Sequence, residues 1–127
     1  MAASVSRIPV RITISEKGTA NGDVFKHFAP RTVNDFLRSL PLQGRVNHAN
    51  SFVYMTSKLI VGGEKRRTAF SRNEMAFLPL NGSICIFLME SKVERPMNPI
   101  GRITSGMEVL DTVTQGDVME IQELANA

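Results

Sequence analysis

The sequence is poor in the residues that usually carry chemistry or covalent stabilisation. Its 127 residues include no tryptophan, one tyrosine and one cysteine. A single cysteine cannot form an internal disulfide, and Cys85 stands in the apolar stretch ICIFL, where a thiol behaves as a small buried side chain. No apolar run approaches the roughly 18 residues of a membrane-spanning helix. The first residues, MAASVSRIPVRI, lack the apolar centre of a signal peptide, so we expect a cytoplasmic protein.

Motifs for metal, nucleotide and triad chemistry are also missing. The two histidines, His27 and His48, have no cysteine, histidine or carboxylate at metal-ligand spacing, so no metal and no cofactor is expected. There is no Gly-x-Ser-x-Gly turn for a hydrolase nucleophile and no phosphate-binding loop. A hydrolase or ligase subunit would have to take its catalytic residues from elsewhere.

The charge is modest and leaves two interpretations open. A formal net charge of +3 permits an acidic partner but does not demand one. One local cluster of basic residues contains Lys65, Arg66, Arg67 and Arg72. It is either a solvated turn or an interaction surface for an acidic partner or RNA. Aromatic residues make up only 6% and form no stacking motif, so nucleic acid is not the preferred partner.

Short extended segments dominate the pattern. Apolar residues alternate with other residues from Ile8 to Ile14, which predicts a strand with one wet face. The stretch 16–23, with Gly18 and Asn21-Gly22, favours a hairpin turn after it, and the returning strand is expected to start at Val24. Later segments are short and are separated by Gly, Pro, Asn or charged residues. We expect them to be strands: SFVYMT, LIVGG, MAFLPL, ICIFLM, IGRIT and DVMEIQEL.

Two short helices are predicted between these strands. The first begins near Pro30, with Thr32 as its cap, and ends before Pro41. The second begins with a capping box of Ser105 and Glu108. Many strands with a helix over each open end fit a closed barrel, which would also remove exposed strand edges. A length of 127 residues suits one domain over 1–127.

Three stretches in this order resemble the cyclophilins, and most closely the small prokaryotic cyclophilin-like proteins of unassigned function. FAPRTVNDFL resembles the first helix of that family, NGSICIFL its Asn-Gly-Ser-Gln-Phe-Phe-Ile turn and strand, and IGRITSGMEVLDTV its entry into the second helix. The resemblance implies a mainly β fold, a closed eight-stranded barrel with two short capping helices.

The resemblance also implies peptidyl-prolyl cis-trans isomerase activity, but this chain lacks the polar residues for it. The family's catalytic arginine, which follows a Phe-His pair, corresponds to Tyr54, and the histidine to Val53. The family's Gln, pocket Phe and groove His correspond to Ile84, Ile86 and Met97. Tyr54 can donate one hydrogen bond but not the charged fork of a guanidinium. We therefore expect weak or absent isomerase activity, with Tyr54 as the candidate catalytic residue.

The leading hypothesis is a groove on the barrel that binds a peptide or small apolar ligand. Candidate binding residues share an apolar character or lie in the basic loop that could replace the missing arginine; they are Phe52, Met55, Arg66, Arg67, Met75, Ile86 and Met97. Methionine adapts to varied ligands. The other interpretation is that Met55, Met75, Met97 and Phe87 simply fill the core.

Overall fold

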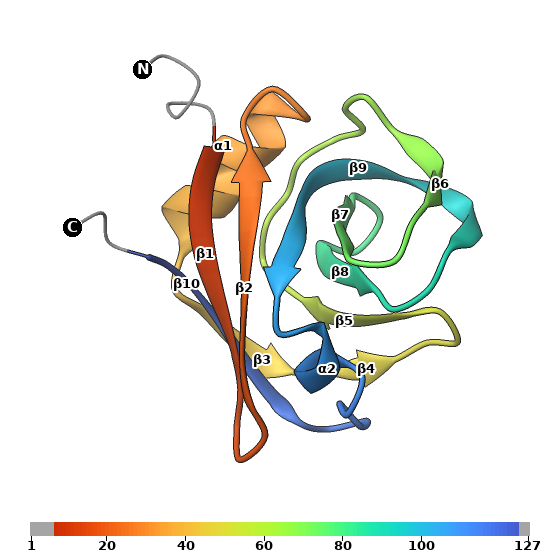
Figure 1. Ribbon diagram of the computed structural model, residues 1–127. Helices are drawn as coiled ribbons and strands as arrows, with labels where there is room; N and C mark the ends of the chain where they lie inside the picture. Colours follow the sequence, from red (N-terminus) through yellow and green to blue (C-terminus); the bar gives the residue numbers. More distant parts are fainter. Residues whose placement is uncertain (1–6, 125–127) are drawn as a thin grey trace.

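The protein is an antiparallel β structure with two short helices. The computed structural model describes residues 7–124. Among these residues no helix is long and apolar enough to cross a membrane. The elements follow one another along the chain as shown in Figure 1: β1 (Arg7–Ile14), β2 (Gly18–Phe25), α1 (Pro30–Ser39), β3 (Leu42–Arg45), β4 (Asn47–His48), β5 (Phe52–Thr56), β6 (Arg67–Phe70), β7 (Glu74–Leu78), β8 (Ser83–Phe87), β9 (Ser91–Ser105), α2 (Met107–Leu110) and β10 (Val118–Glu123).

The strands form one sheet of ten, where the prediction was eight. Their order is β3-β10-β1-β2-β9-β7-β8-β5-β4, and β6 lies off this path and pairs with β9. The first and last strands of the order, β3 and β4, are consecutive in the sequence with only Val46 between them. The chain itself therefore connects the two edges of the sheet, although the ladders described pair β3 with β10 and β4 with β5.

One large apolar cluster, which we call the inner core, lies on the concave side of the sheet. Alternate residues of the strands supply it, as period-two patterning requires. Phe36 of α1 and Leu110 close to the end of α2 are fully buried in it. Its strand residues include Val10, Ile12, Ile14, Val53, Met55, Met75, Phe77, Ile84, Ile86, Ile100 and Ile121.

Both helices occur where the sequence predicts them, but their caps differ from the prediction. The residue before α1 is Ala29, and no side chain at that position caps the helix, so Thr32 is not the cap. The capping box of Ser105 is also wrong, because Ser105 ends β9 and Gly106, at φ 86°, precedes α2. A cap must adopt a non-helical conformation just before the first turn, and Thr32 already lies inside it.

The predicted hairpin turn is displaced. The β1–β2 connection spans 15–17, whereas Asn21-Gly22 lies within β2, where the pairing with β9 shifts register. Gly22 and Gly101 permit close approach of these two strands: a Cβ at Gly101 would lie 2.1 Å from the backbone oxygen of Asp23. These glycines bend the sheet instead of ending a strand.

The segment LIVGG is a loop, not the predicted strand, and lies within the connection 57–66 between β5 and β6. Only Val61 of its apolar residues is buried, and Ile60 is 95% exposed. Three strands were not predicted from the sequence, β3, β4 and β6. They carry few apolar residues, so alternation gives little signal.

Candidate functional site

Strand β5 presents different side chains to the two faces of the sheet. Val53 and Met55 belong to the inner core. Phe52 and Tyr54 point to the opposite, outer face, where they are half-buried. The separation follows from the pleat of a strand, in which neighbouring residues alternate between faces.

The outer face bears a second apolar cluster, which we call the outer cluster. It is buried beneath β6 and the first part of β9, which pair with each other in a separate ribbon (Figure 1). The rings of Phe70 and Phe87 are stacked within it, 4.7 Å between centroids and 11° between planes. Its buried members are Phe70, Ala76, Cys85, Phe87 and Met97, with Phe52, Tyr54, Leu78 and Val93 packed against them.

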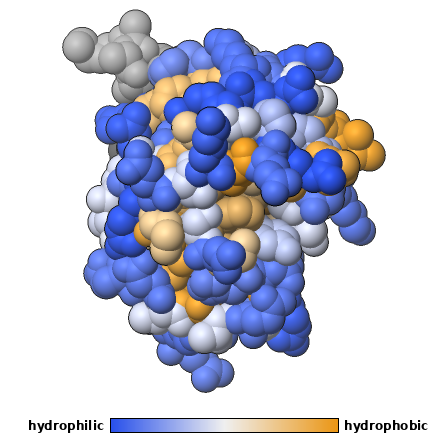
Figure 2. All heavy atoms as spheres, turned by 90° about the vertical axis from the view of Figure 1, so that its right-hand side faces the viewer, coloured by the Kyte–Doolittle hydropathy of each residue, from blue (hydrophilic) through white to orange (hydrophobic). Residues whose placement is uncertain are grey.

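A groove of about 570 Å³ opens beside the outer cluster. Phe52, Leu78, Val93 and Met97 supply apolar surface, and Met89 lies at its margin with 52% exposure. Charged residues of both signs also line it: Glu90, Lys92, Glu94 and Arg95. Figure 2 shows apolar residues framed by hydrophilic ones on the side of the molecule that bears β6.

Aromatic contacts connect the buried stack to the groove. The Phe52 ring lies 5.0 Å from Phe87 and 5.7 Å from Tyr54, centroid to centroid. Tyr54 faces Cys85 across the β5–β8 ladder and packs against the outer cluster. The two half-buried rings thus continue a rigid, buried aromatic surface to the solvent boundary.

The structure does not bring the predicted binding residues together on one face. Phe52, Tyr54 and Met97 share the outer face. Met55, Met75 and Ile86 lie in the inner core with 1%, 0% and 0% exposure, which corrects the expectation that they share a face with Tyr54. These three side chains fill the core, which for Met55 and Met75 was the other interpretation of the sequence.

The predicted arginines lie outside the groove. Arg67 donates a hydrogen bond to Glu74 Oε2 at 2.6 Å and lies over the Phe70 ring, 4.7 Å from its centroid. Arg66 lines a separate hollow together with Gly63 and Pro96. Neither Arg66 nor Arg67 lines the groove beside the outer cluster.

The basic cluster is divided between different parts of the molecule. Arg72 donates two hydrogen bonds to the Asp111 carboxylate, at 2.9 and 2.8 Å. The hydrogen bonds of this pair raise the pKa of Arg72 and lower that of Asp111. Lys65, Arg66 and Arg67 line one hollow, but Arg72 does not, and Arg67 and Arg72 each have a carboxylate partner. The four residues therefore do not form the single basic surface that the sequence suggested.

A buried polar network, absent from the sequence prediction, attaches the 57–66 loop to α1. The Glu64 carboxylate accepts hydrogen bonds from the backbone N–H of Arg31 at 3.0 Å and of Thr32 at 2.9 Å, and from the Thr32 hydroxyl at 2.9 Å. Asn98, fully buried, donates to Thr32 Oγ1 at 2.9 Å and accepts from the Glu64 N–H at 2.8 Å. Glu64 thereby caps the helix from outside it.

The network also sets the ionisation of Glu64. Partial burial acts to raise the pKa of its carboxyl, but the hydrogen bonds from Arg31 and Thr32 outweigh burial and hold the pKa below its usual 4.5. The capping glutamate lies 33 residues from Arg31 in the sequence, so no local motif could identify it.

Reactive and metal-binding groups are scarce in the described part of the chain. Burial raises the pKa of the Cys85 thiol to about 12, which leaves it protonated at neutral pH. Within residues 7–124 no three His, Cys, Asp or Glu side chains are grouped to hold a metal ion. The outer face offers apolar and aromatic contact instead of a nucleophile.

Comparisons with known proteins agree with this fold. A solved structure of the hypothetical protein AF2241 from Archaeoglobus fulgidus superposes with a TM-score of 0.80 at 22% identity, covering 94% of this chain and 96% of that one. A structure of McbB in complex with tryptophan gives 0.75 at 15% identity, covering 93% of this chain and 45% of the other. No curated protein matches the sequence. Residues 8–122 match the cyclophilin-like family, and the chain belongs to that family.

Proposed function

We propose that this protein binds a peptide or small apolar ligand by an aromatic or apolar group in the outer groove, and that it has weak or no prolyl isomerase activity. The observation that carries the proposal is the half-buried ring of Phe52, which lines the groove and contacts both the buried Phe87 ring and the half-buried Tyr54 ring. A closed barrel, suggested by the chain continuity of β3 and β4, is the scaffold in this proposal, and the cytoplasm its location.

The groove has the composition of a ligand site. Its apolar surface includes one aromatic ring, Phe52, and lies beside polar and charged residues, and apolar surface with polar groups is what sites for small molecules offer. Covering exposed apolar area contributes roughly 25 cal/mol per Å². Charged residues of both signs can form hydrogen bonds with the polar backbone of a peptide; they are Glu90, Glu94, Lys92 and Arg95. Binding needs no movement of the stacked rings beneath.

An aromatic group is the first ligand chemistry to test. McbB, which shares the fold at low identity, has been solved with tryptophan bound. The chain described here has aromatic rings and the Met97 side chain at its outer face, and both form favourable contacts with an aromatic guest. An aromatic amino-acid derivative therefore makes a suitable probe.

The donors available at the outer face support the proposal of weak or absent isomerase activity. Rotation about the prolyl bond has a barrier of about 18–20 kcal/mol, and catalysis requires a preference for the twisted amide. Tyr54 provides a single hydroxyl donor. Arg67, which could supply a guanidinium, is held by Glu74 and Phe70. Arg95 does line the groove, but its side chain is exposed to solvent, where a guanidinium stabilises a twisted amide less than in a desolvated pocket.

Calorimetric titration with N-acetyl-tryptophanamide and with a short Phe-Pro peptide tests the binding proposal. We expect saturable binding that Phe52→Ala weakens by about tenfold, the effect of losing an aromatic contact of roughly 1–1.5 kcal/mol. Tyr54→Ala should weaken binding less, because Tyr54 packs against Phe52 and does not itself line the groove. Phe25→Ala removes a half-buried ring stacked on Phe28, away from the groove, and serves as the control. Equal affinity in Tyr54→Ala, Phe52→Ala and Phe25→Ala would contradict the site.

Exchange spectroscopy tests the absence of catalysis. With the Phe-Pro peptide in large excess, we expect the cis-trans exchange rate to stay at its uncatalysed value. Marked acceleration that disappears in Tyr54→Phe would show that the tyrosine hydroxyl replaces the family's arginine. That result would refute the proposed lack of isomerase activity but would remain compatible with the binding proposal.

A further inference from the structure

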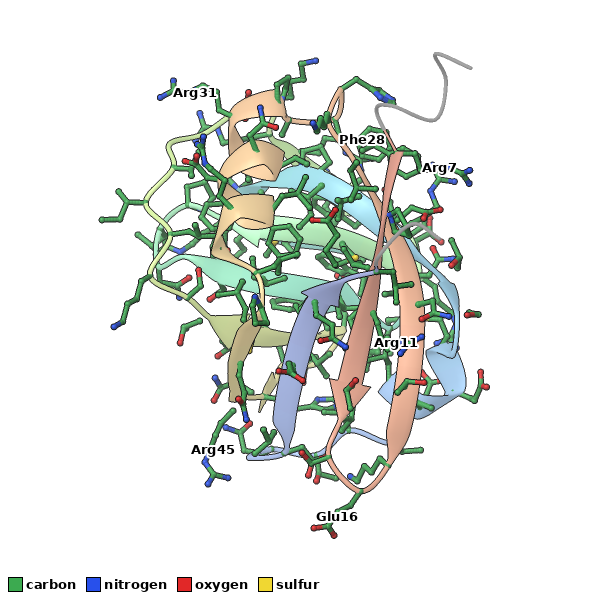
Figure 3. The ribbon with its side chains drawn as sticks, turned by 90° about the vertical axis from the view of Figure 1, so that its left-hand side faces the viewer. Arg7, Arg11, Glu16, Phe28, Arg31 and Arg45 are labelled. Carbon is green, nitrogen blue, oxygen red and sulfur yellow. The ribbon has the colours of Figure 1, made fainter. Side chains whose placement is uncertain are left out.

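Two loops that are distant in the sequence lie side by side at one end of the molecule. The Lys65 ammonium donates a hydrogen bond to the backbone oxygen of His27 at 3.0 Å. Beside it, the Glu64 carboxylate accepts the N–H groups of Arg31 and Thr32. Figure 3 shows Arg31 and Phe28 at this end, opposite Arg45 and Glu16. The contacts therefore bring residues 26–31 and 63–67 into one surface.

This surface carries cations without local neutralisation. Arg31, Lys65 and Arg66 are exposed, and Lys26 is half-exposed. In the described residues, no carboxylate oxygen lies within 4.0 Å of the cationic nitrogens of these four side chains. Glu64, which is close enough to interact with the charge of Arg31, already accepts three hydrogen bonds. An excess of positive charge therefore remains at this end, which we call the basic end.

A hollow of about 570 Å³ adjoins these cations. It is lined by Gly63, Lys65, Arg66, Arg67, Thr68 and Pro96. Of its three cations, Arg67 is paired with Glu74, whereas Lys65 and Arg66 have no carboxylate partner among the described residues. Arg66 lies against Gly63, where an added Cβ would be 2.5 Å from the Arg66 Cδ and Nε. The glycine thus makes room for the guanidinium at the wall of the hollow.

An exposed aromatic ring completes the basic end. The His27 ring packs edge-on against Phe28 at 5.0 Å and Phe25 at 5.7 Å, and His27 itself is exposed. Cations that contact phosphates next to a ring that can stack on a base form the combination used for single-stranded nucleic acids and nucleotides. The helix N-terminus is not the anion site, since Glu64 occupies it.

We infer that the basic end, with Lys65 and Arg66 at its hollow and His27 beside it, binds a phosphate group attached to an aromatic base, either as a free nucleotide or within single-stranded RNA. This site is separate from the outer groove and does not depend on the ligand of that groove. It differs from the basic cluster suggested by the sequence, because Arg72 is absent and Lys26 and Arg31 are added.

The test uses the full chain with two probes, ADP followed by NMR and a fluorescent ten-nucleotide single-stranded RNA followed by anisotropy. Lys65→Ala with Arg66→Ala should weaken RNA binding about tenfold or more and reduce the slope of log affinity against log salt by about 1, as expected when one or two phosphate contacts are lost. The control variant, Arg11→Ala with Arg45→Ala, removes the same charge elsewhere and should leave the RNA affinity and the salt slope unchanged. His27→Ala should weaken binding with the salt slope preserved.

The two probes distinguish the source of the phosphate. Binding of both, or of RNA alone, with the dependence on Lys65 and Arg66 described above, assigns a single-stranded RNA ligand. Binding of ADP alone assigns a free nucleotide. Binding of neither probe at low salt, or equal loss in the two double variants, would overturn the inference, and circular dichroism confirms that each variant is folded.

Discussion

The two faces of strands β5, β8 and β7 differ in how completely they are covered. On the inner face, Val53, Met55, Ile84, Ile86, Met75 and Phe77 are all at most 1% exposed. On the outer face, Ala76, Cys85 and Phe87 are buried, but Phe52, Tyr54 and Leu78 stay half-buried. The same three strands therefore stabilise the fold with one set of alternate residues, and we propose that the other set contributes to ligand binding.

The largest effect should come from the inner face. Phe77→Ala removes a fully buried ring and should lower the free energy of unfolding by about 3–5 kcal/mol, through lost transfer energy and the cavity left behind. Chemical denaturation of the wild type and the variant measures this difference. A loss below about 1 kcal/mol would show that the inner face is not the sealed core described.

A smaller loss is expected when the cap of α1 is weakened. Glu64→Gln should reduce the free energy of unfolding by about 1 kcal/mol at neutral pH, the typical effect of losing a helix cap. Since the pKa of Glu64 is lower in the folded state, its stabilisation is complete above the usual 4.5 and is lost as pH falls through the folded-state pKa.

Denaturation curves at pH 7 and pH 3 check this dependence. The difference between wild type and Glu64→Gln should shrink at the lower pH, where the unfolded-state glutamate is protonated and ionised Glu64 contributes less to stability. Asp35→Asn, in the same helix but in a pair with Arg38 on the surface, provides a matched control. A difference that stayed constant between the two pH values would contradict the proposed charge-dependent cap.

Tyr54→Ala tests whether the outer face contributes less to stability than the inner face. Because Tyr54 is half-buried on the outer face, its removal should cost less than about 1 kcal/mol of stability while it weakens ligand binding. Denaturation and calorimetric titration of one preparation give both quantities. A stability loss as large as that of Phe77→Ala would mean that both faces serve the core alike.

The smallest effect concerns Cys85, which lies in the outer cluster but beneath its surface. Its thiol should not react measurably with a disulfide reagent at pH 8, since burial raises its pKa to about 12 and blocks access. Stoichiometric reaction should appear once denaturant unfolds the chain. Rapid reaction of the folded protein would show that the outer cluster opens.

Most strands could be predicted from the sequence because their apolar residues alternate. The alternation from Ile8 to Ile14 corresponds to β1, and SFVYMT contains β5. LIVGG was wrongly predicted because a short apolar run has no fixed period, and tertiary contacts decide its conformation. Asn21-Gly22 has turn chemistry, but here it produces a bulge between β2 and β9.

The candidate site was predicted only in part. Phe52, Tyr54 and Met97 lie together on the outer face, whereas Met55, Met75 and Ile86 face inward, as strand alternation requires for neighbours such as Tyr54 and Met55. Glu64, Thr32 and Asn98 meet only through tertiary structure, across separations of 32 and 34 residues. Sequence spacing carries no signal for such contacts.

The most direct test of the outer binding face is an NMR titration of the isotopically labelled protein with N-acetyl-tryptophanamide. We expect saturable shifts of side-chain resonances of Phe52, Leu78 and Met97 beside the groove, with much smaller changes for Met75 and Ile86 in the inner core. No shift at the groove, or saturable shifts confined to the basic end, would contradict it.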